Sequence, residues 1–254
     1  MTDIAFLKSR QGKLYLFLCF IFLTNAILAE IIGVKIFSLE KYLNTNPAQF
    51  HLPFDFVLDF NLTAGVVIWP IVFITSDLIN EYFGKPGLKR VSYLTAGFIA
   101  YSFSIIYFST TLPPADFWLD LNKSQYGEGF NIDTSFSLIF RQGLGIIVGS
   151  IVAFLIGQVV DAHAFQYFKS ITGSKKIWLR ATGSTLVSQL IDSFVVLWVA
   201  FYLFGNWPLK MVIAVGIINY IYKFVIAVAL TPLLYPAHNL IDKYLGKDEK
   251  EIVD

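Results

Sequence analysis

Charged residues are scarce in this chain. Only 15% of its 254 residues are Asp, Glu, Lys or Arg, whereas soluble domains contain about 25%. The mean hydropathy is +0.64, and a net charge of +1 offers no basic surface of the kind that binds nucleic acid. Nucleic acid is therefore not expected as a partner, and the shortage of charge indicates a protein surrounded by lipid.

Cysteine, histidine and glycine-rich motifs are also scarce, and each absence argues against a class of function. The single cysteine, Cys19, excludes an intramolecular disulfide framework. The three histidines, His51, His163 and His238, are scattered and form no His-Glu-x-x-His motif, so no metal or other cofactor is expected. No Walker-type loop and no Gly-x-Ser-x-Gly occurs. The chain is not expected to hydrolyse ATP, and an intramembrane enzyme stays only as a rival from another class.

Long apolar runs are abundant. A helix that crosses a bilayer needs about 20 mostly apolar residues, and the first run is too long for a signal peptide and lacks a cleavage site. Buried helices of a soluble protein are the alternative, but the chain has too little polar sequence to cover them. We predict an all-α polytopic membrane protein, a single integral membrane domain over 1–254 with about six transmembrane helices. The six predicted spans are 14–36, 62–80, 91–112, 136–160, 181–204 and 210–236.

The basic residues alternate from one loop to the next. Lys and Arg near the ends of spans stay on the cytoplasmic side. Most of the 19 basic residues fall in the N-terminal segment, the second loop, the fourth loop and the C-terminal tail. This pattern predicts that both termini are cytoplasmic. The loop 37–61 then lies outside as a short hairpin or along the membrane surface, and the loop 113–135 is an extracellular connection.

Ionisable and amide side chains interrupt the apolar runs. An ionised group in mid-bilayer is costly unless it is paired or faces water. Asp77, Asn80 and Glu81 stand at i, i+3 and i+4 and so share one helix face, although Glu81 also fits an interfacial position. The segment 188–193 repeats this spacing. The pattern predicts several polar faces that turn toward one internal cavity. The other polar residues considered are Glu30, Arg141, Gln158, Asp161, Gln189, Asp192, Asn219 and Lys223.

Some of these groups have a purely structural interpretation. Asp192 and Lys223 both fall near the middle of their spans, where they can pair. Arg141 and Glu30 lie toward the outer side, and an Arg141–Glu30 pair would hold the helix bundle in the same way. Asp161 is expected at the cytoplasmic end of the fourth span.

The two halves of the sequence resemble each other weakly. "SDLINE" (76–81) aligns with "SQLIDS" (188–193), and "AEIIGVKIF" (29–37) aligns with "GQVVDAHAF" (157–165). Three spans in each half would give the halves opposite orientations. We therefore consider a 3+3 inverted repeat, an arrangement that places the substrate at the interface of the repeats in transporters.

Four segments together resemble one known family. They are "AGVVIWPIVFITSDLINEYFGK", "GQVVDAHAF", "STLVSQLIDSFVVLWVAF" and "NYIYKFVIAVALTPLLY", which run in order from Ala64 to Tyr235. The chain resembles the queuosine precursor transporter family. The resemblance implies a multi-pass protein of the cell inner membrane that imports 7-deazaguanines, chiefly 7-cyano-7-deazaguanine and its aminomethyl relative, for queuosine salvage.

The resemblance also implies which residues act. A guanine-like base presents neighbouring N–H donors that a carboxylate accepts, whereas Lys or Gln donates to its carbonyl group, and aromatic rings stack on it. Asn219 stands where some members have an acid, so a proton-carrying role does not transfer to it, but its amide stays in the expected substrate-binding set. Matched position by position, the resemblance implies roles for Asp77, Glu81, Arg141, Gln158, Asp161, Gln189, Asp192 and Lys223.

Several alternatives stay open from the sequence. A secondary transporter of another small planar heterocycle or vitamin-like solute is the alternative to an importer of queuosine precursors. Uptake can be driven by a proton gradient, by metabolic trapping of the solute, or by a separate ATP-driven module. The expected partners are the small-molecule solute and the lipid bilayer, and a homo-oligomer is left open.

Overall fold

The structure is a computed structural model, and it describes residues 8–52, 56–141, 144–172, 177–203 and 207–246. Long helices dominate, and the only strands of the described part lie in one connecting segment. The elements are α2 (Arg10–Ile32), β1 (Ile36–Ser38), α3 (Leu39–Tyr42), β2 (Phe50–Leu52), β3 (Phe56–Leu58), β4 (Asn61–Thr63), the 3₁₀ helix η2 (Ala64–Val67), α4 (Trp69–Ser109), α5 (Asp116–Tyr126), α6 (Ile132–Arg141), α7 (Leu144–Thr172), α8 (Ile177–Val196), the π-helix η3 (Leu197–Leu203) and α9 (Leu209–Leu245).

The helices have the length and composition of a membrane protein. Within the described ranges, five helices are long and apolar enough to cross a bilayer: α2, α4, α9, the part of α7 over 149–172, and the continuous run of α8 and η3 over 182–203. Many large apolar side chains on their outer faces are exposed, which suits a lipid environment rather than water. The chain is an all-α polytopic membrane protein.

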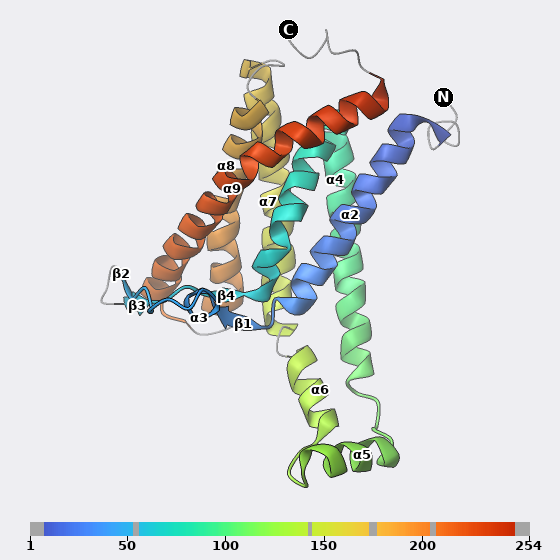
Figure 1. The fold of residues 1–254 in the computed structure, drawn as a ribbon, viewed down its shortest axis with the longest axis vertical. Helices are drawn as coiled ribbons and strands as arrows, with labels where there is room; N and C mark the ends of the chain where they lie inside the picture. The colour runs from blue at the N-terminus through green and yellow to red at the C-terminus, as the bar shows by residue number, and fades with distance from the viewer. Residues whose placement is uncertain (1–7, 53–55, 142–143, 173–176, 204–206, 247–254) are drawn as a thin grey trace.

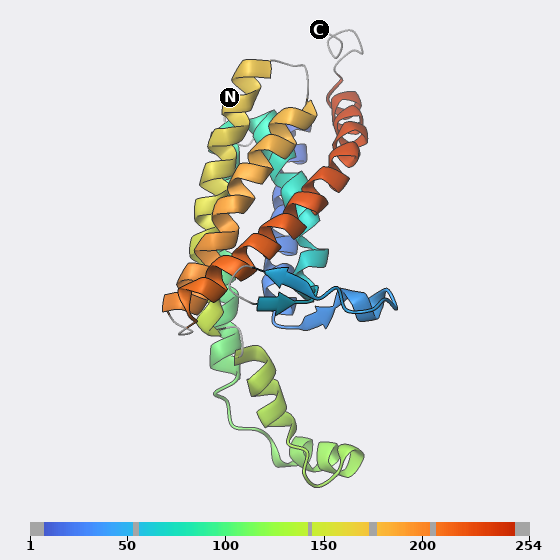
Figure 2. The same ribbon diagram turned by 90° about the vertical axis from the view of Figure 1, so that its left-hand side faces the viewer.

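Gly84 interrupts α4 and turns the chain back on itself. Its backbone angles, φ 65° and ψ −177°, lie in a region that is essentially restricted to glycine. The two limbs of α4, 69–83 and 85–109, run side by side in opposite directions (Figures 1 and 2). The second and third predicted spans fall largely on these two limbs. A phenolic hydroxyl on α2 holds the turn, because Tyr15 donates to the carbonyl of Gly87 at 2.9 Å.

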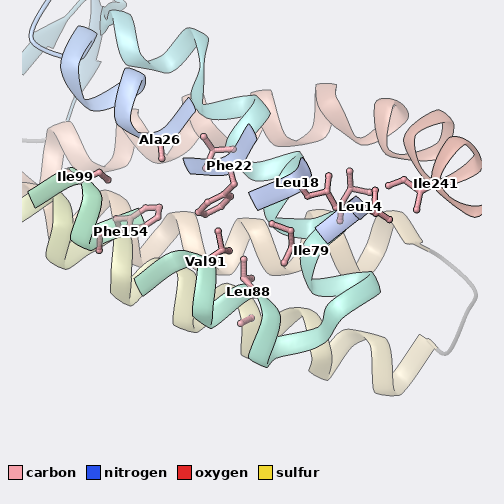
Figure 3. Close-up of a cluster of buried hydrophobic side chains, with 14 of the residues drawn as sticks. Leu14, Leu18, Phe22, Ala26, Ile79, Leu88, Val91, Ile99, Phe154 and Ile241 are labelled. Atoms are coloured by element: carbon pink, nitrogen blue, oxygen red, sulfur yellow. The ribbon is translucent and has the colours of Figure 1, made fainter. Parts of the chain in front are cut away.

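An apolar core joins α2, α4 and α7. Leu14, Leu18 and Phe22 follow one another at i+4 along α2 and so form a single ridge. Figure 3 shows this ridge between residues of both α4 limbs, with Phe22 near Phe154 of α7. The two ring centroids are 6.0 Å apart. In lipid such packing supplies van der Waals contact rather than removal from water. The core therefore fixes α2 and α7 against α4, while α8 packs mainly on α7 and α9.

The segment predicted as an outer hairpin forms two small antiparallel pairs. β1 pairs with β4, and β2 pairs with β3. Glu40 of α3 organises the segment: its carboxylate accepts the backbone N–H of Phe60 at 2.5 Å and the hydroxyl of Ser38 at 2.9 Å. Burial of the carboxyl group acts to raise its pKa, but these hydrogen bonds outweigh burial, and the pKa of Glu40 lies below its ordinary value.

Acid is expected to loosen this outer segment. Because the folded pKa of Glu40 is depressed, its contribution to stability is present above the ordinary pKa of about 4.3 and is lost as pH falls through the folded value. Cleavage of 37–61 by pepsin should therefore increase from pH 5 to pH 3 in the purified protein. Glu40→Gln should be cleaved similarly at both pH values, and Glu128→Gln, which changes an exposed acid elsewhere, should behave like the unmodified chain. A Glu40→Gln variant that keeps the full pH dependence contradicts this role.

The fourth predicted span, 136–160, is placed too early. Residues 132–141 form the separate short helix α6, which extends with α5 beyond the bundle (Figure 2), and the long helix α7 ends only at Thr172. Two expectations are corrected. Arg141 ends α6 and does not lie inside a long helix. Asp161 lies well within α7 rather than at its end. A hydropathy window cannot separate the apolar face of an amphipathic helix from the start of a span.

The last turns of α9 cross the ends of other helices. At 37 residues and about 1.5 Å per residue, α9 is longer than the bilayer core of about 30 Å. Its last turns pass over the start of α2 and the Gly84 turn of α4 (Figure 1), where Ile241 joins the apolar core. The hydroxyl of Tyr82 on α4 lies 2.8 Å from Nδ1 of His238 and 2.9 Å from Oδ1 of Asp242. We call residues 236–245 the α9 strap.

The inverted repeat stays a prediction. The segments 76–81 and 188–193 both lie on helices, α4 and α8. The second pair differs in local structure, since the chain leaves α2 after Ile32 and enters β1, whereas 157–165 lies wholly within α7.

Candidate functional site

The first limb of α4 carries the polar face that the sequence indicated. Asp77 is 6% exposed and Asn80 is fully buried. The amide of Gln166 on α7 donates to Oδ1 of Asn80 at 2.8 Å. One turn after Asp77, Glu81 forms an ion pair with Lys169 of α7 at 3.2 Å. This face is therefore turned into the helix bundle and packs against α7 rather than lipid.

Polar groups of α7 and α8 meet the same region. Asp161 is 3% exposed, and the hydroxyl of Ser188 on α8 lies 3.4 Å from its Oδ1. Asp161 and Asp77 are near enough to interact electrostatically. Gln158, one turn earlier on α7, is buried, and the hydroxyl of Ser92 lies 3.4 Å from its Oε1. Two acids from different helices are thus buried in the same part of the protein interior.

A small cavity opens beside Asp77. Its free volume is about 20 Å³, which suffices for a water molecule but is far below the roughly 300–1,000 Å³ of typical ligand pockets. Phe73 also lines it, and its ring stacks on that of Trp69 with centroids 5.8 Å apart. Its lining residues come from α4, α8 and α9: Phe73, Ile74, Asp77, Thr182, Thr185, Ala227, Leu230, Thr231 and Leu234.

A second polar group lies around the mid-helix acid of α8. Lys223 of α9 donates to Asp192 and forms an ion pair with it, as the sequence suggested. Gly157 of α7 lies directly against Asp192, since a Cβ added to the glycine would stand 3.6 Å from that of Asp192, in ordinary van der Waals contact. Glu30 of α2 accepts the hydroxyl of Ser150 at 2.5 Å and interacts electrostatically with Asp192.

Several buried polar atoms have no protein partner within the described ranges. An unsatisfied buried donor or acceptor costs about 1–3 kcal/mol. Such atoms on facing helices therefore mark a place for water or a polar solute. They are Oδ1 of Asp77, Nδ2 of Asn80, Oγ1 of Thr95, Oδ2 of Asp161, Oε1 of Gln189 and Oγ of Ser193.

Two residues of the expected set remain: Arg141 lies apart from the buried polar groups, and Asn219 lies on α9 near Lys223. Arg141 donates through Nε to Oγ1 of Thr110 at 2.7 Å, and its guanidinium stands 5.4 Å from the ring centroid of Tyr107. The alternative of an Arg141–Glu30 pair is therefore wrong, because each side chain has a different partner. Asn219 is partly buried on α9, one turn before Lys223.

Sequence reasoning missed the hydroxyl groups of the cavity. Thr182 of α8 and Thr231 of α9 approach each other to 2.5 Å between their hydroxyl oxygens, and Thr185 is buried beside them. The only signal was the i, i+3 spacing of Thr182 and Thr185 among small residues. Among the described residues, no three His, Cys, Asp or Glu come together in a way that could hold a metal ion.

The fold and its buried polar faces are those of a polytopic membrane transporter. Residues 63–237 match the family described as "Putative vitamin uptake transporter", and the chain belongs to this family. The matched region includes α4, α7 and α8 and most of α9, and so the polar residues described above on these four helices.

Named relatives are all described as transporters. The chain is 28% identical over 185 residues to the "Probable queuosine precursor transporter" of Bacillus subtilis, which covers 72% of this chain and 75% of the relative. It is 24% identical over 206 residues to the "Queuosine precursor transporter" of Escherichia coli, covering 77% and 81%. No solved structure gave a significant match. The resemblance found in the motifs is confirmed, and the chain is a multi-pass membrane transporter rather than an enzyme.

Proposed function

We propose that the chain imports queuosine precursors across the cytoplasmic membrane. The observation that carries the proposal is the similarity to relatives with that name over 72–77% of the chain. The buried carboxylates and amides of α4, α7 and α8 supply the acceptors and donors that a 7-deazaguanine needs. 7-Cyano-7-deazaguanine and its aminomethyl relative are the proposed substrates.

Six crossings with both termini in the cytoplasm are part of the proposal. They consist of α2, the two limbs of α4, α7, α8 with η3, and α9. The start of α2, the Gly84 turn, the end of α7 and the α9 strap gather at one end of the molecule (Figure 1). Lys85, Lys89, Lys169 and Lys243 belong to these segments, and basic residues near span ends favour the cytoplasmic side.

Substrate recognition is assigned first to Asp77. Its unpartnered Oδ1 borders the cavity, and an ionised carboxylate accepts two neighbouring N–H groups of a guanine-like edge. Gln158 and Gln189 are placed to bind the remaining polar edge, and the ring of Phe73 to stack on the solute. We further assign Glu81 to the inner end of the path, Asp192, Lys223 and Asn219 to its outer part, and Arg141 to its entrance.

The cavity must widen for a solute to enter. A volume of about 20 Å³ cannot hold a bicyclic base, so the described conformation is closed around the site. Movement of α8 and α9 against α4 would enlarge the cavity, because its lining is divided between these helices. Opening alternately to the two sides of the membrane is the general behaviour of secondary transporters.

Uptake in whole cells tests the proposal. Cells unable to synthesise the precursor should incorporate queuosine into tRNA from added 7-cyano-7-deazaguanine only when they express this chain. Unlabelled guanine in tenfold excess should compete poorly with labelled precursor. Expression that leaves incorporation at background, with the protein present in the membrane, contradicts the proposal.

A vitamin-like planar solute is the second candidate, and the description of the family favours it. The same cells can be offered labelled flavin, biotin or other heterocyclic vitamins. Saturable uptake of one of these, with no uptake of 7-cyano-7-deazaguanine, would replace the first candidate by the second.

A further inference from the structure

Two buried acids in the transport region lack a positive partner. Asp77 and Asp161 are 6% and 3% exposed. Oδ1 of Asp77 and Oδ2 of Asp161 have no hydrogen-bond partner within the described ranges. The two side chains interact electrostatically, and Asp77 borders the cavity. Two ionised carboxylates that are buried away from water would repel each other, and neither would be solvated.

The other acids of α4 and α8 form ion pairs with cations. Glu81, one turn from Asp77, is paired with Lys169 of α7. Asp192, further along α8, is paired with Lys223 of α9. Among the described acids of α4, α7 and α8, Asp77 and Asp161 are therefore the two that have no cationic partner.

We propose that one proton is held by the Asp77–Asp161 pair, on one or the other carboxyl group, and that this proton crosses the membrane together with the solute. The proposal rests on the transport function proposed above and adds its driving ion. A proton fits the site better than a divalent cation, because no three acidic, His or Cys side chains of the described part converge as metal ligands. The only covalent change is the O–H bond that a carboxylate of the pair forms with a proton from the outer side. The bond breaks again when the proton is released toward the cytoplasm.

The geometry couples the proton to the solute. Asp77 must be ionised to accept two N–H groups of the solute, so the proton is then held by Asp161, whose Oδ2 is buried without a hydrogen-bond partner within the described ranges. A neutral Asp161 no longer repels the ionised Asp77. Proton binding therefore strengthens solute binding and, by linkage, solute binding strengthens proton binding.

The groups around the pair are mostly neutral. From α8 the contacts of Asp161 are hydroxyl groups, those of Ser184 and Ser188. From α4, the charged neighbour of Asp77 is Glu81, which is paired with Lys169. On α9 the titratable side chains on either side of the cavity lining are Lys223, which is paired with Asp192, and Tyr235, which is exposed. In the strap, His238 contacts the hydroxyl of Tyr82.

Purified full-length protein in liposomes gives the decisive measurement. Labelled 7-cyano-7-deazaguanine is the solute, and a trapped pH-sensitive dye reports protons. We expect an inwardly acting proton gradient to concentrate the solute at least tenfold, and added solute to carry protons inward. Exchange of labelled for unlabelled solute without any gradient tests the transport function separately: its absence in the unmodified protein defeats the proposed function itself.

Variants locate the proton. The affinity of the unmodified protein for solute should fall as pH rises from 6 to 9, because the pair loses its proton. Asp161→Asn, which is permanently neutral, should bind with an affinity that does not change over this range and should carry no protons. Asp161→Glu keeps an ionisable carboxyl group, so its affinity for solute should again depend on pH, as in the unmodified protein. Asp116→Asn, at an exposed acid of α5, is the matched control and should behave like the unmodified chain.

Three results overturn the proposal while leaving the transport function intact. In the first, the unmodified protein exchanges solute but neither responds to a proton gradient nor moves protons. In the second, a sodium gradient drives accumulation at constant pH. In the third, Asp161→Asn still concentrates solute in a proton gradient. The first two are decided on the unmodified protein, so they do not depend on how well a variant folds.

Discussion

Lys223→Ala is expected to reduce uptake of labelled 7-cyano-7-deazaguanine by cells to the level of cells without the protein. The Lys223 ammonium donates to Asp192 between α9 and α8, and its loss leaves a carboxylate unpaired among helices. Removing one partner of a fully buried ion pair costs about 3–5 kcal/mol. Here the two side chains retain 25% and 20% exposure, so the loss of stability should be smaller. Initial uptake rates should be normalised to the amount of protein in the membrane. Asp192→Asn should have the same effect.

A double variant separates a transport role from a structural one. Asp192→Asn combined with Lys223→Gln removes both charges and leaves neither group unpaired. If the pair only holds α8 against α9, the double variant should regain both membrane insertion and uptake. We expect insertion to recover and uptake to stay below a tenth of the unmodified rate. Normal uptake by the two single variants would refute the assignment of the pair to the path.

Asp77→Asn is expected to weaken solute binding about 10- to 100-fold. The change preserves the size of the side chain, but the amide offers one acceptor oxygen and turns an N–H group toward the donors of the solute. A hydrogen bond to a charged group contributes about 1.5–3 kcal/mol, and each 1.4 kcal/mol corresponds to about a factor of ten in Kd. Titration of the purified protein with 7-cyano-7-deazaguanine measures the effect.

Two matched variants show whether the effect belongs to the Asp77 carboxylate. Thr185→Val removes a hydroxyl from the same cavity while keeping a side chain of the same shape, and should weaken binding less than Asp77→Asn. Asp120→Asn changes an exposed acid of α5 and should leave Kd unchanged. An Asp77→Asn variant with unaltered Kd contradicts the placement of Asp77 against the solute.

The sequence predicted the helices and one shared polar face, because both depend on spacing along a single chain. The apolar runs fall largely on α2, the limbs of α4, α8 and α9, and the i, i+3, i+4 spacing places Asp77 and Asn80 on one buried face. The Asp192–Lys223 pair was also foreseen, since both residues stand at mid-helix.

The remaining errors concern contacts that only the tertiary structure determines. Arg141 binds Thr110 at the end of α4, a partner that no local pattern indicates. The depth of Asp161 was misjudged because an average over hydropathy joined α6 to α7. The contact between Thr182 and Thr231 depends on the packing of α8 against α9, which no local sequence pattern indicates. Short hydroxyl side chains stand out neither in a search for apolar runs nor in a search for ionisable and amide residues within those runs.

The α9 strap limits how the proposed path can open at the end of the bundle where the strap lies. Tyr82, one turn beyond Asp77 on the same limb, is hydrogen-bonded to Asp242 of the strap, and Arg10 at the start of α2 reaches the carbonyl of Tyr244. Widening the path at this end must therefore either break these bonds or carry the end of α9 along. A bulky protein fused directly after Leu245 would be attached to the segment that must move when the path opens. Affinity tags and fluorescent reporters should therefore be placed after a spacer, so that they do not hinder this movement.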